Sequence, residues 1–177
     1  MQKSTGAERI RAFISLDPGQ RTGVAIWRTG EGRIGKPPHL VALWRVIKEL
    51  QSKPWEYRCY LLGSMLDNVL SNPAYEWSGV YCELPAFFES AKGMAAAGRG
   101  DIVKLSYLVG LYAGICHSRK VHFGTVPVND WKGQLPKSVI KKRILKRFGV
   151  AACAYFKGDI WDAVGIGLYV KGINFQT

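Results

Sequence analysis

The stretch AFISLDPGQRTGVAIWR, residues 12–28, decides how this chain folds. Its first half is an apolar run that ends in Asp17-Pro18-Gly19, a strong turn signal, and its second half resumes as another apolar run. Two such runs around a short turn predict a β-hairpin. Asp17 therefore lies where a strand ends, and a carboxylate at this place either begins the turn or belongs to a site.

The rest of the chain predicts an α/β fold. Three further strands are expected, at 39–47, 78–84 and 121–128. Helices are expected to open at Ser52-Pro54, Asp101, Pro136 and Asp159. Three antiparallel strands, followed by two more that helical crossovers join, predict a five-stranded mixed sheet in the order 3-2-1-4-5, flanked by helices.

Length and composition predict one domain. With 177 residues, 47% of them hydrophobic, the chain can bury a real core but not two, and flexible tails are expected at 1–10 and 173–177. The first residues lack the apolar core of a signal peptide, and no apolar stretch is long enough for a bilayer span. The four cysteines are scattered, which favours a reducing, cytoplasmic compartment.

The charge predicts an anionic partner. The formal net charge is +12, from 25 Lys+Arg against 13 Asp+Glu. Nucleic acid is the first candidate and an acidic membrane surface the second. Many soluble proteins are mildly basic without such a partner, but a surplus of this size favours nucleic acid.

Four acidic residues stand out against this basic background. Asp17 ends the first strand, and Glu83, in GVYCELP, ends the fourth. Sites in such sheets gather at the carboxyl ends of the parallel strands. Asp159 and Asp162, in GDIWDAVGIGLYV, are three residues apart and share one face of a helix that can point to the same edge. Gathered carboxylates are typical Mg²⁺ ligands, so we expect a metal site.

Each acid also has a simpler interpretation. Asp17 before Pro-Gly is ordinary turn chemistry, and Glu83 near Pro85 suits a charge at a strand end on the surface. Asp159 suits the N-cap of the last helix. Asp162 is the hardest to explain in this way, because it lies between apolar neighbours on an apolar helix, where an uncompensated charge is costly.

Three segments together resemble a known family. LDPGQRTGVAIW, YCELP and GDIWDAVGIGL are similar to the three acidic motifs of RuvC-type Holliday junction resolvases, in the ribonuclease H-like superfamily. The resemblance covers about residues 12–170 and suits a bacterial or bacteriophage source. It implies a ribonuclease H-like fold and a homodimer that cuts two strands of a four-way DNA junction symmetrically, in DNA recombination and repair.

The resemblance also assigns roles to residues. It implies that Asp17, Glu83, Asp159 and Asp162 hold two Mg²⁺ ions, for which Mn²⁺ can substitute, and that these ions activate a water. WKGQLPKSVIKKR at 131–143 is similar to the family's basic approach to the site. Lys132 and Lys137 lie near its functional lysines, and Lys137 is the expected catalytic one.

DNA contacts are expected from two segments. The basic helix offers Lys132, Lys137, Lys141, Lys142 and Arg147, although a run of charges is often only a solvated helix face. After Glu83, the aromatics Phe87 and Phe88 either wedge into the junction, as the resemblance implies, or fill the core. Lys92 and Arg99 belong to a Gly/Ala-rich loop that DNA would order.

Other functions compete with this prediction. Another ribonuclease H-like nuclease would act on RNA–DNA hybrids or other branched DNA. A kinase or actin-type ATPase needs a second phosphate loop, which the chain lacks, so no nucleotide cofactor is expected. No membrane partner is expected either. A non-catalytic basic DNA-binding module would keep the acids only as remnants. Gly110 and Gly114 suit close helix packing, either within the chain, which is the more common case, or across a dimer interface.

Overall fold

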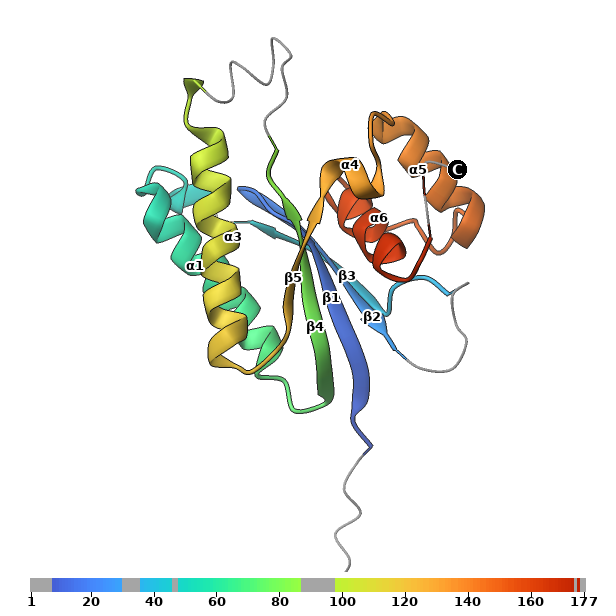
Figure 1. Cartoon of the computed structure of the whole chain (residues 1–177), viewed down its shortest axis with the longest axis horizontal. Coiled ribbons are helices and arrows are strands. Elements are labelled where there is room, and N and C mark those ends of the chain that lie inside the picture. Colours follow the sequence, from blue (N-terminus) through green and yellow to red (C-terminus); the bar gives the residue numbers. More distant parts are fainter. Residues whose placement is uncertain (1–7, 30–35, 46–47, 87–97, 174, 176–177) are drawn as a thin grey trace, which may run out of the picture.

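A central five-stranded sheet organises the computed structural model, which describes residues 8–29, 36–45, 48–86, 98–173 and 175. The strands lie in the order β3-β2-β1-β4-β5 (Figure 1). Their bounds are β1 Ile10–Asp17, β2 Arg21–Arg28, β3 Leu40–Arg45, β4 Tyr75–Leu84 and β5 Phe123–Pro127. The expected strand order is confirmed.

The pairing directions divide the sheet in two. β1 pairs antiparallel with β2, and β2 pairs antiparallel with β3. On the other side, β4 runs parallel to β1 and to β5. The carboxyl ends of β1, β4 and β5 therefore meet at one edge, where Asp17 ends β1 and Glu83 lies one residue before the end of β4.

Helices cover both faces of the sheet. Helices α1 and α3 lie together on one face, and α6 lies on the other with α5 packed against it (Figure 1). The helices are α1 Trp55–Leu70, α3 Asp101–Ser118, α4 Val128–Trp131, α5 Lys137–Phe148 and α6 Ile160–Val170, with a short 3₁₀ helix, η1, at Lys48–Leu50. No helix in the described part of the chain is long and apolar enough to cross a membrane.

Alternation along β1 builds two cores. Ala12, Ile14 and Leu16 face α1 and α3, where they pack among buried side chains of both helices. Phe13 faces the opposite way, into a second core formed largely by α6 and α5. Because side chains of a strand alternate between faces, Ser15 and Asp17 share the side of Phe13 and so face α6.

The structure differs from the sequence-based expectations at element ends. β4 begins at Tyr75, and α1 begins after Pro54 without a side-chain cap, so Ser52 does not cap it. The short helix α4, which follows β5 directly, was not expected. The predicted tails are too long, because Ile10 already belongs to β1 and Phe175 is buried beside Trp131, with the ring centroids 6.3 Å apart.

Candidate carboxylate and metal site

Helix α6 is fixed against the sheet at the level of the strand ends. The Ser15 hydroxyl donates to the backbone oxygen of Ala163 at 2.7 Å, and Trp27 Nε1 donates to that hydroxyl at 2.9 Å. A side chain on Gly23 would collide with the backbone of Asp159, so the first turn of α6 lies directly on β2. Gly23 is also the register partner of Asp17, which brings the two segments together.

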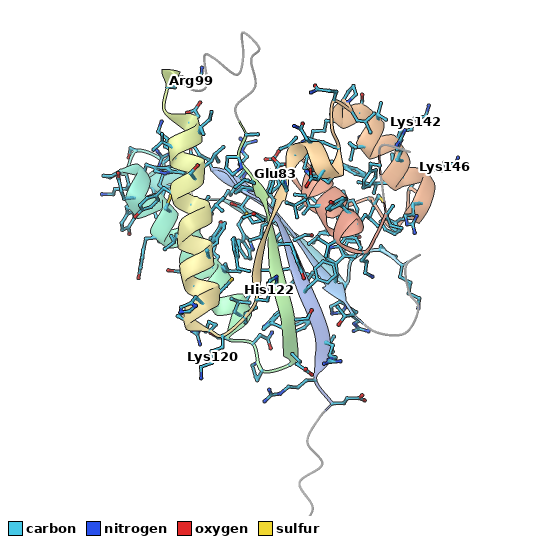
Figure 2. The ribbon with its side chains drawn as sticks, in the orientation of Figure 1. Glu83, Arg99, Lys120, His122, Lys142 and Lys146 are labelled. Atoms are coloured by element: carbon cyan, nitrogen blue, oxygen red, sulfur yellow. The ribbon has the colours of Figure 1, made fainter. Side chains whose placement is uncertain are left out.

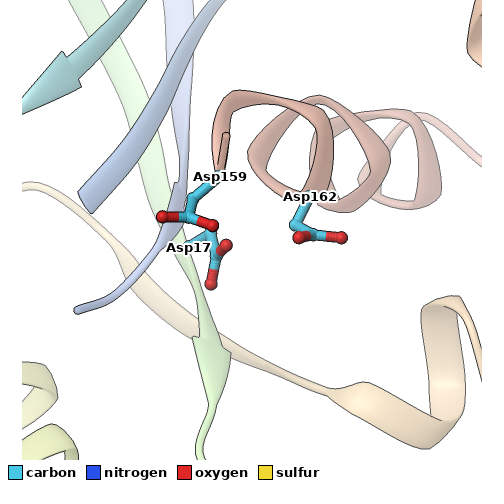
Figure 3. A group of neighbouring side chains, drawn as sticks. All are labelled: Asp17, Asp159 and Asp162. Atoms are coloured by element: carbon cyan, nitrogen blue, oxygen red, sulfur yellow. The ribbon is translucent and has the colours of Figure 1, made fainter. Parts of the chain in front are cut away.

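Three carboxylates meet where α6 begins. Oxygen atoms of Asp17, Asp159 and Asp162 lie within 4.8 Å of one another, and Figure 3 shows them grouped between the end of β1 and α6. Asp159 precedes the helix and Asp162 lies in its first turn. The positive end of the helix dipole stabilises carboxylates at this place.

Glu83 joins the site from β4. Its Oε2 accepts a hydrogen bond of 3.0 Å from Trp131 Nε1, which orients the carboxylate. Its charge reaches Asp17, because the repulsion between them contributes to a raised pKa of Asp17. The structure therefore brings all four predicted acids to one edge, with three in direct proximity and Glu83 beside them.

Two lysines lie among the acids. Lys132 Nζ is 3.7 Å from Glu83 Oε2 and 3.6 Å from Asp162 Oδ1, and it lies over the Trp131 ring. Lys137 Nζ is 3.0 Å from Asp159 Oδ1 and also pairs with Asp162. Four carboxylates against two ammonium groups leave an excess of two negative charges when all are ionised.

The electrostatics of the cluster favour a bound cation. Burial, followed by repulsion from Glu83, Asp162 and Asp159, raises the pKa of Asp17 well above its ordinary value. Burial also raises the pKa of Glu83, although Lys132 and the Trp131 hydrogen bond oppose this shift. Crowded carboxylates that resist ionisation in this way are stabilised as anions by an added positive charge.

The donor atoms fit a hard divalent ion. All four acidic groups offer oxygen, which Mg²⁺ prefers, and Asp162 is only 5% exposed. Its Oδ1 is buried without a hydrogen-bond partner, since Lys132 Nζ is too distant for one. A buried unpaired carboxylate oxygen beside two further carboxylates is a ready ligand, so the residues present fit a metal site.

Partial burial acts to lower the pKa of Lys137, but hydrogen bonds and attraction from Asp162 and Asp159 raise it overall. Its ammonium group therefore stays protonated through the neutral range. Lys137 is the first residue of α5, after Pro136, so the helix start holds this charge at the site. Its position agrees with the catalytic role expected for it, which stays a prediction.

The predicted DNA-contacting residues divide between described and undescribed parts of the chain. Lys142 and Lys146 lie on the outer side of α5 (Figure 2), while Lys141 packs over the Trp161 ring at 5.2 Å. Arg99 precedes α3 and forms an ion pair of 2.9 Å with Asp101. Phe87, Phe88 and Lys92 lie outside the described residues, so their expected roles stay predictions.

Sequence reasoning missed the residues that hold the acids in place. Trp131, Ser15, Trp27 and Gly23 support the cluster without being acidic. Ser15 gave a signal that was not used, as the one polar residue in the apolar run AFISL. Trp131 gave no such signal, because its partner Glu83 is far away in sequence.

Known structures share the fold of this chain. RuvC from Thermus thermophilus superimposes with a TM-score of 0.65 at 16% identity, covering 91% of this chain and 96% of that one. T. thermophilus RuvC in complex with a Holliday junction substrate gives 0.64 at 13% identity, over 92% and 96% of the two chains. Fowlpox virus resolvase, in a complex with substrate Holliday junction DNA, gives 0.54 at 14%, over 91% and 99%.

These likenesses confirm the fold. The mixed sheet with the order 3-2-1-4-5 and its flanking helices are the ribonuclease H-like fold of RuvC. In sequence, the chain matches no protein-family model and no curated protein.

Proposed function

We propose that this protein is a structure-selective endodeoxyribonuclease that resolves four-way DNA junctions. The observation that carries the proposal is the carboxylate cluster at the strand ends of a ribonuclease H-like sheet, in a chain with a net charge of +12. Two of the proteins that share the fold were solved with Holliday junction DNA, which supports a branched substrate.

We infer that the site works with two Mg²⁺ ions, for which Mn²⁺ can substitute. The proposed ligands are the four acids that the structure brings to this edge of the sheet. They are the grouped Asp17, Asp159 and Asp162, together with Glu83, which Trp131 orients beside them. When bound, such ions lower the pKa of a coordinated water and stabilise the leaving oxygen of the phosphodiester.

The protein's own groups orient this chemistry. Trp131 holds Glu83 through its indole N–H, and Ser15 holds the helix that carries Asp162. Lys137 is proposed to stabilise the crowded negative charge of the phosphate in the transition state. Lys132, held over the Trp131 ring between Glu83 and Asp162, balances these carboxylates before the substrate arrives.

DNA binding is assigned to the basic surface around the site. The outer side of α5, with Lys142 and Lys146, supplies phosphate contacts, which depend on charge rather than sequence. Lys132, Lys141, Arg147 and Arg99 extend this surface. Phe87, Phe88 and Lys92 follow Glu83 closely in the chain and are proposed to meet the centre of the junction.

A homodimer would match the two-fold symmetry of a four-way junction. The exposed face of α1 and α3 suits a second copy, because Tyr60, Val103 and Tyr107 are 64%, 73% and 52% exposed there. A groove of about 380 Å³ between these helices is lined by Tyr60 and Leu111 among others. A Cβ on Gly110 or Gly114 would touch nothing in the described chain, so neither glycine packs closely against another described residue, and the alternative of packing across a dimer interface stays open.

A cleavage assay tests the proposed function. The protein is incubated with a labelled four-way junction, a matched duplex and an RNA–DNA hybrid, each with Mg²⁺ or with EDTA. We expect paired, symmetric nicks in the junction alone, only with the metal. Asp162→Asn should abolish cleavage and keep junction binding, since it removes a proposed ligand and one negative charge near the phosphate.

The matched control is Glu76→Gln, which removes a surface carboxylate that accepts a hydrogen bond of 3.2 Å from Arg11, far from the carboxylate cluster and from the groove between α1 and α3. It should cut like the wild type. Cleavage of the hybrid instead of the junction would assign the same site to another ribonuclease H-like nuclease. Tight DNA binding without cutting under any metal would leave a non-catalytic DNA-binding module.

A further inference from the structure

A second basic site lies at the catalytic edge of the sheet. The pocket between the β1–β2 turn, the end of β3 and the start of α1 has a volume of about 120 Å³. We call it the arginine pocket, and its lining includes Gln20, Arg21, Arg45, Gln51, Trp55 and Arg58. Pockets for drug-sized ligands measure roughly 300–1,000 Å³, so this one suits a small group such as a phosphate.

Three arginines of separate segments line the arginine pocket. Arg21 and Arg45 are direct register partners on β2 and β3, an arrangement of like charges that is destabilising by itself. Arg58 reaches the same pocket from the first turn of α1. Within the described residues, no carboxylate lies at ion-pair distance from any of the three. An external anion would compensate them.

Arg58 is held ready for such an anion. Its guanidinium lies 5.2 Å from the centroid of the Trp55 ring, and Trp55 Nε1 donates to the backbone oxygen of Lys104 at 3.2 Å. Arg58 Nε is buried and has no hydrogen-bond partner. A buried donor of this kind costs free energy unless a ligand accepts from it, and a side chain already fixed by stacking loses little entropy on binding.

The start of α1 adds to the attraction. Pro54 precedes the helix, and no side chain caps its first N–H groups. Such a helix end carries a partial positive charge and binds phosphate groups readily. The helix end, the stacked arginine and the Arg21–Arg45 pair all belong to one small pocket.

The pocket lies close to the carboxylate cluster along the chain. Asp17 faces Gly23 in the β1–β2 register, and Arg21 is two residues further toward the turn. Two residues of a strand span about 7 Å, which is close to the rise of two nucleotides at about 3.4 Å each. A DNA strand that reaches Asp17 can therefore pass the arginine pocket within one or two nucleotides of it.

We propose that the arginine pocket binds one backbone phosphate of the DNA strand that enters the carboxylate cluster, one or two nucleotides from the cleaved bond. This inference rests on the proposed function, since it takes that strand as the source of the phosphate. The pocket would fix the register of the strand, because a bidentate arginine contact at a set distance from the site allows one phosphate at a time to reach the acids.

A double-mutant cycle between protein and DNA tests the proposal. Junctions are prepared with a single neutral methylphosphonate at successive positions around the exchange point, and their affinity is measured by fluorescence anisotropy in EDTA. For the wild type, we expect one position near the cut to lose about tenfold in affinity. The Arg21→Ala/Arg45→Ala variant should bind the unmodified junction about tenfold more weakly but lose nothing more at that position.

Controls separate this outcome from general loss of charge or of fold. Arg11→Ala removes an exposed arginine at the opposite end of β1 and should behave like the wild type at every position. Arg58→Gln should reproduce the double variant. If that change unfolds the protein, the exposed Arg21 and Arg45 still carry the test, with thermal unfolding as the check.

The result is decisive in both directions. The proposal would be overturned if the affinity loss of the Arg21→Ala/Arg45→Ala variant and that of the methylphosphonate multiplied at every DNA position. It would also be overturned if the double variant bound the unmodified junction like the wild type. Cleavage of the unmodified junction with Mg²⁺ tests the proposed function separately. Energetic coupling between the pocket arginines and one phosphate, without cleavage, would refute the nuclease and keep phosphate binding by the pocket. Cleavage without this coupling would refute only the role of the pocket.

Discussion

Asp17 is a buried acid of the cluster whose pKa is raised by its burial and by its acidic neighbours. Among the described residues it has no ion-pair partner, and burial together with three neighbouring acids raises its pKa well above the ordinary value of 3.8. Between that value and its raised pKa, the folded protein holds a proton that the unfolded chain has lost. The resulting stability is fully present below the ordinary pKa and is lost as the pH rises through the raised pKa.

Asp17→Asn should therefore stabilise the metal-free protein in a pH-dependent way. The asparagine cannot ionise, so the variant and the wild type should melt alike near pH 4 and diverge as the pH rises. At about pH 8 we expect the variant to melt a few degrees higher, where ~1 kcal/mol corresponds to about 2–4 °C. Thermal unfolding in EDTA across this range measures the difference.

Magnesium should reverse the order of the two proteins. Ligand binding to the folded state raises its stability, so Mg²⁺ should raise the melting temperature of the wild type but not of Asp17→Asn. Equal shifts in both proteins would contradict the assignment of Asp17 as a ligand. A difference in melting temperature that does not change with pH would contradict the repulsion argument.

Lys137 is expected to act in the reaction rather than in binding. It pairs with Asp159 and Asp162, where the cleaved phosphate would lie. Removing one such positive donor typically costs about 10²–10³-fold in rate, so Lys137→Ala should reduce single-turnover cleavage by this amount. Junction affinity should change much less.

Lys142→Ala is the matched control, because it removes the same charge from the outer side of the same helix (Figure 2). It should weaken binding slightly and leave the rate at saturation unchanged. Equal loss of rate in the two variants would assign Lys137 to general electrostatics and not to the site.

At the level of single residues, sequence could predict the acids but not their supports. Asp17, Glu83 and Asp162 were predictable because a carboxylate at the end of an apolar strand or on an apolar helix needs a reason to be there. Trp131 was not, because its hydrogen bond to Glu83 depends on how α4 turns after β5. The arginine pocket was missed because its three arginines come from separate segments.

Among the elements, α6 determines whether the site forms. Its residues Ile160 to Leu168 are all buried, so the helix is enclosed and cannot shift without disturbing the core. The close approach to β2 depends on Gly23, where a Cβ would collide with the backbone of Asp159. Since that neighbour is backbone, it cannot move aside as a flexible side chain would.

Gly23→Ala should therefore displace the first turn of α6. Overpacking of this kind costs about 1–3 kcal/mol, and we expect a lower melting temperature together with loss of the Mg²⁺-dependent shift. Gly19→Ala is the control in the neighbouring turn, where a Cβ would make an ordinary contact of 3.5 Å. A Gly23→Ala protein that keeps its Mg²⁺ response would show that α6 tolerates the displacement.

Helix α5 is expected to contribute affinity without chemistry. Ile140 and Ile144 are fully buried, so this side of the helix is fixed and the opposite side presents Lys142 and Lys146 to solvent. Each phosphate contact that is lost lowers the slope of log affinity against log salt by about 0.9. Lys142→Ala/Lys146→Ala should flatten the slope by up to roughly two such steps.

A matched double variant, Arg11→Ala/Lys120→Asn, removes two charges far from the site, since Lys120 lies at the end of α3 opposite Glu83 (Figure 2). Asparagine suits Lys120 because that residue has a φ of 56°. Salt titrations of junction binding compare the two. An unchanged slope for the α5 variant would remove this helix from the DNA surface.

For the whole molecule, the strand order was predictable because chain order limits the topologies. Three strands joined by short connections pair antiparallel, and each later strand that follows a helical crossover runs parallel, which leaves few arrangements. The face that each helix would cover depends on the crossovers and is seen only in the structure, where α1 and α3 lie opposite α6 (Figure 1). This division leaves an apolar face far from α5.

That apolar face should hold two copies together. Val103, Tyr107 and Leu111 follow one another at intervals of four residues and so lie on one side of α3, beside the groove that Tyr60 lines. Tyr107→Glu adds a charge at the centre of this surface and should convert a dimer to a monomer in sedimentation velocity. Tyr155→Glu, at an 81% exposed position after α5, should stay dimeric. Because the described part of one chain carries one carboxylate cluster, the monomer should nick only one strand of a junction per binding event, whereas the proposed dimer should cut two. Paired cuts by a monomeric Tyr107→Glu protein would show that symmetric cleavage does not need this interface.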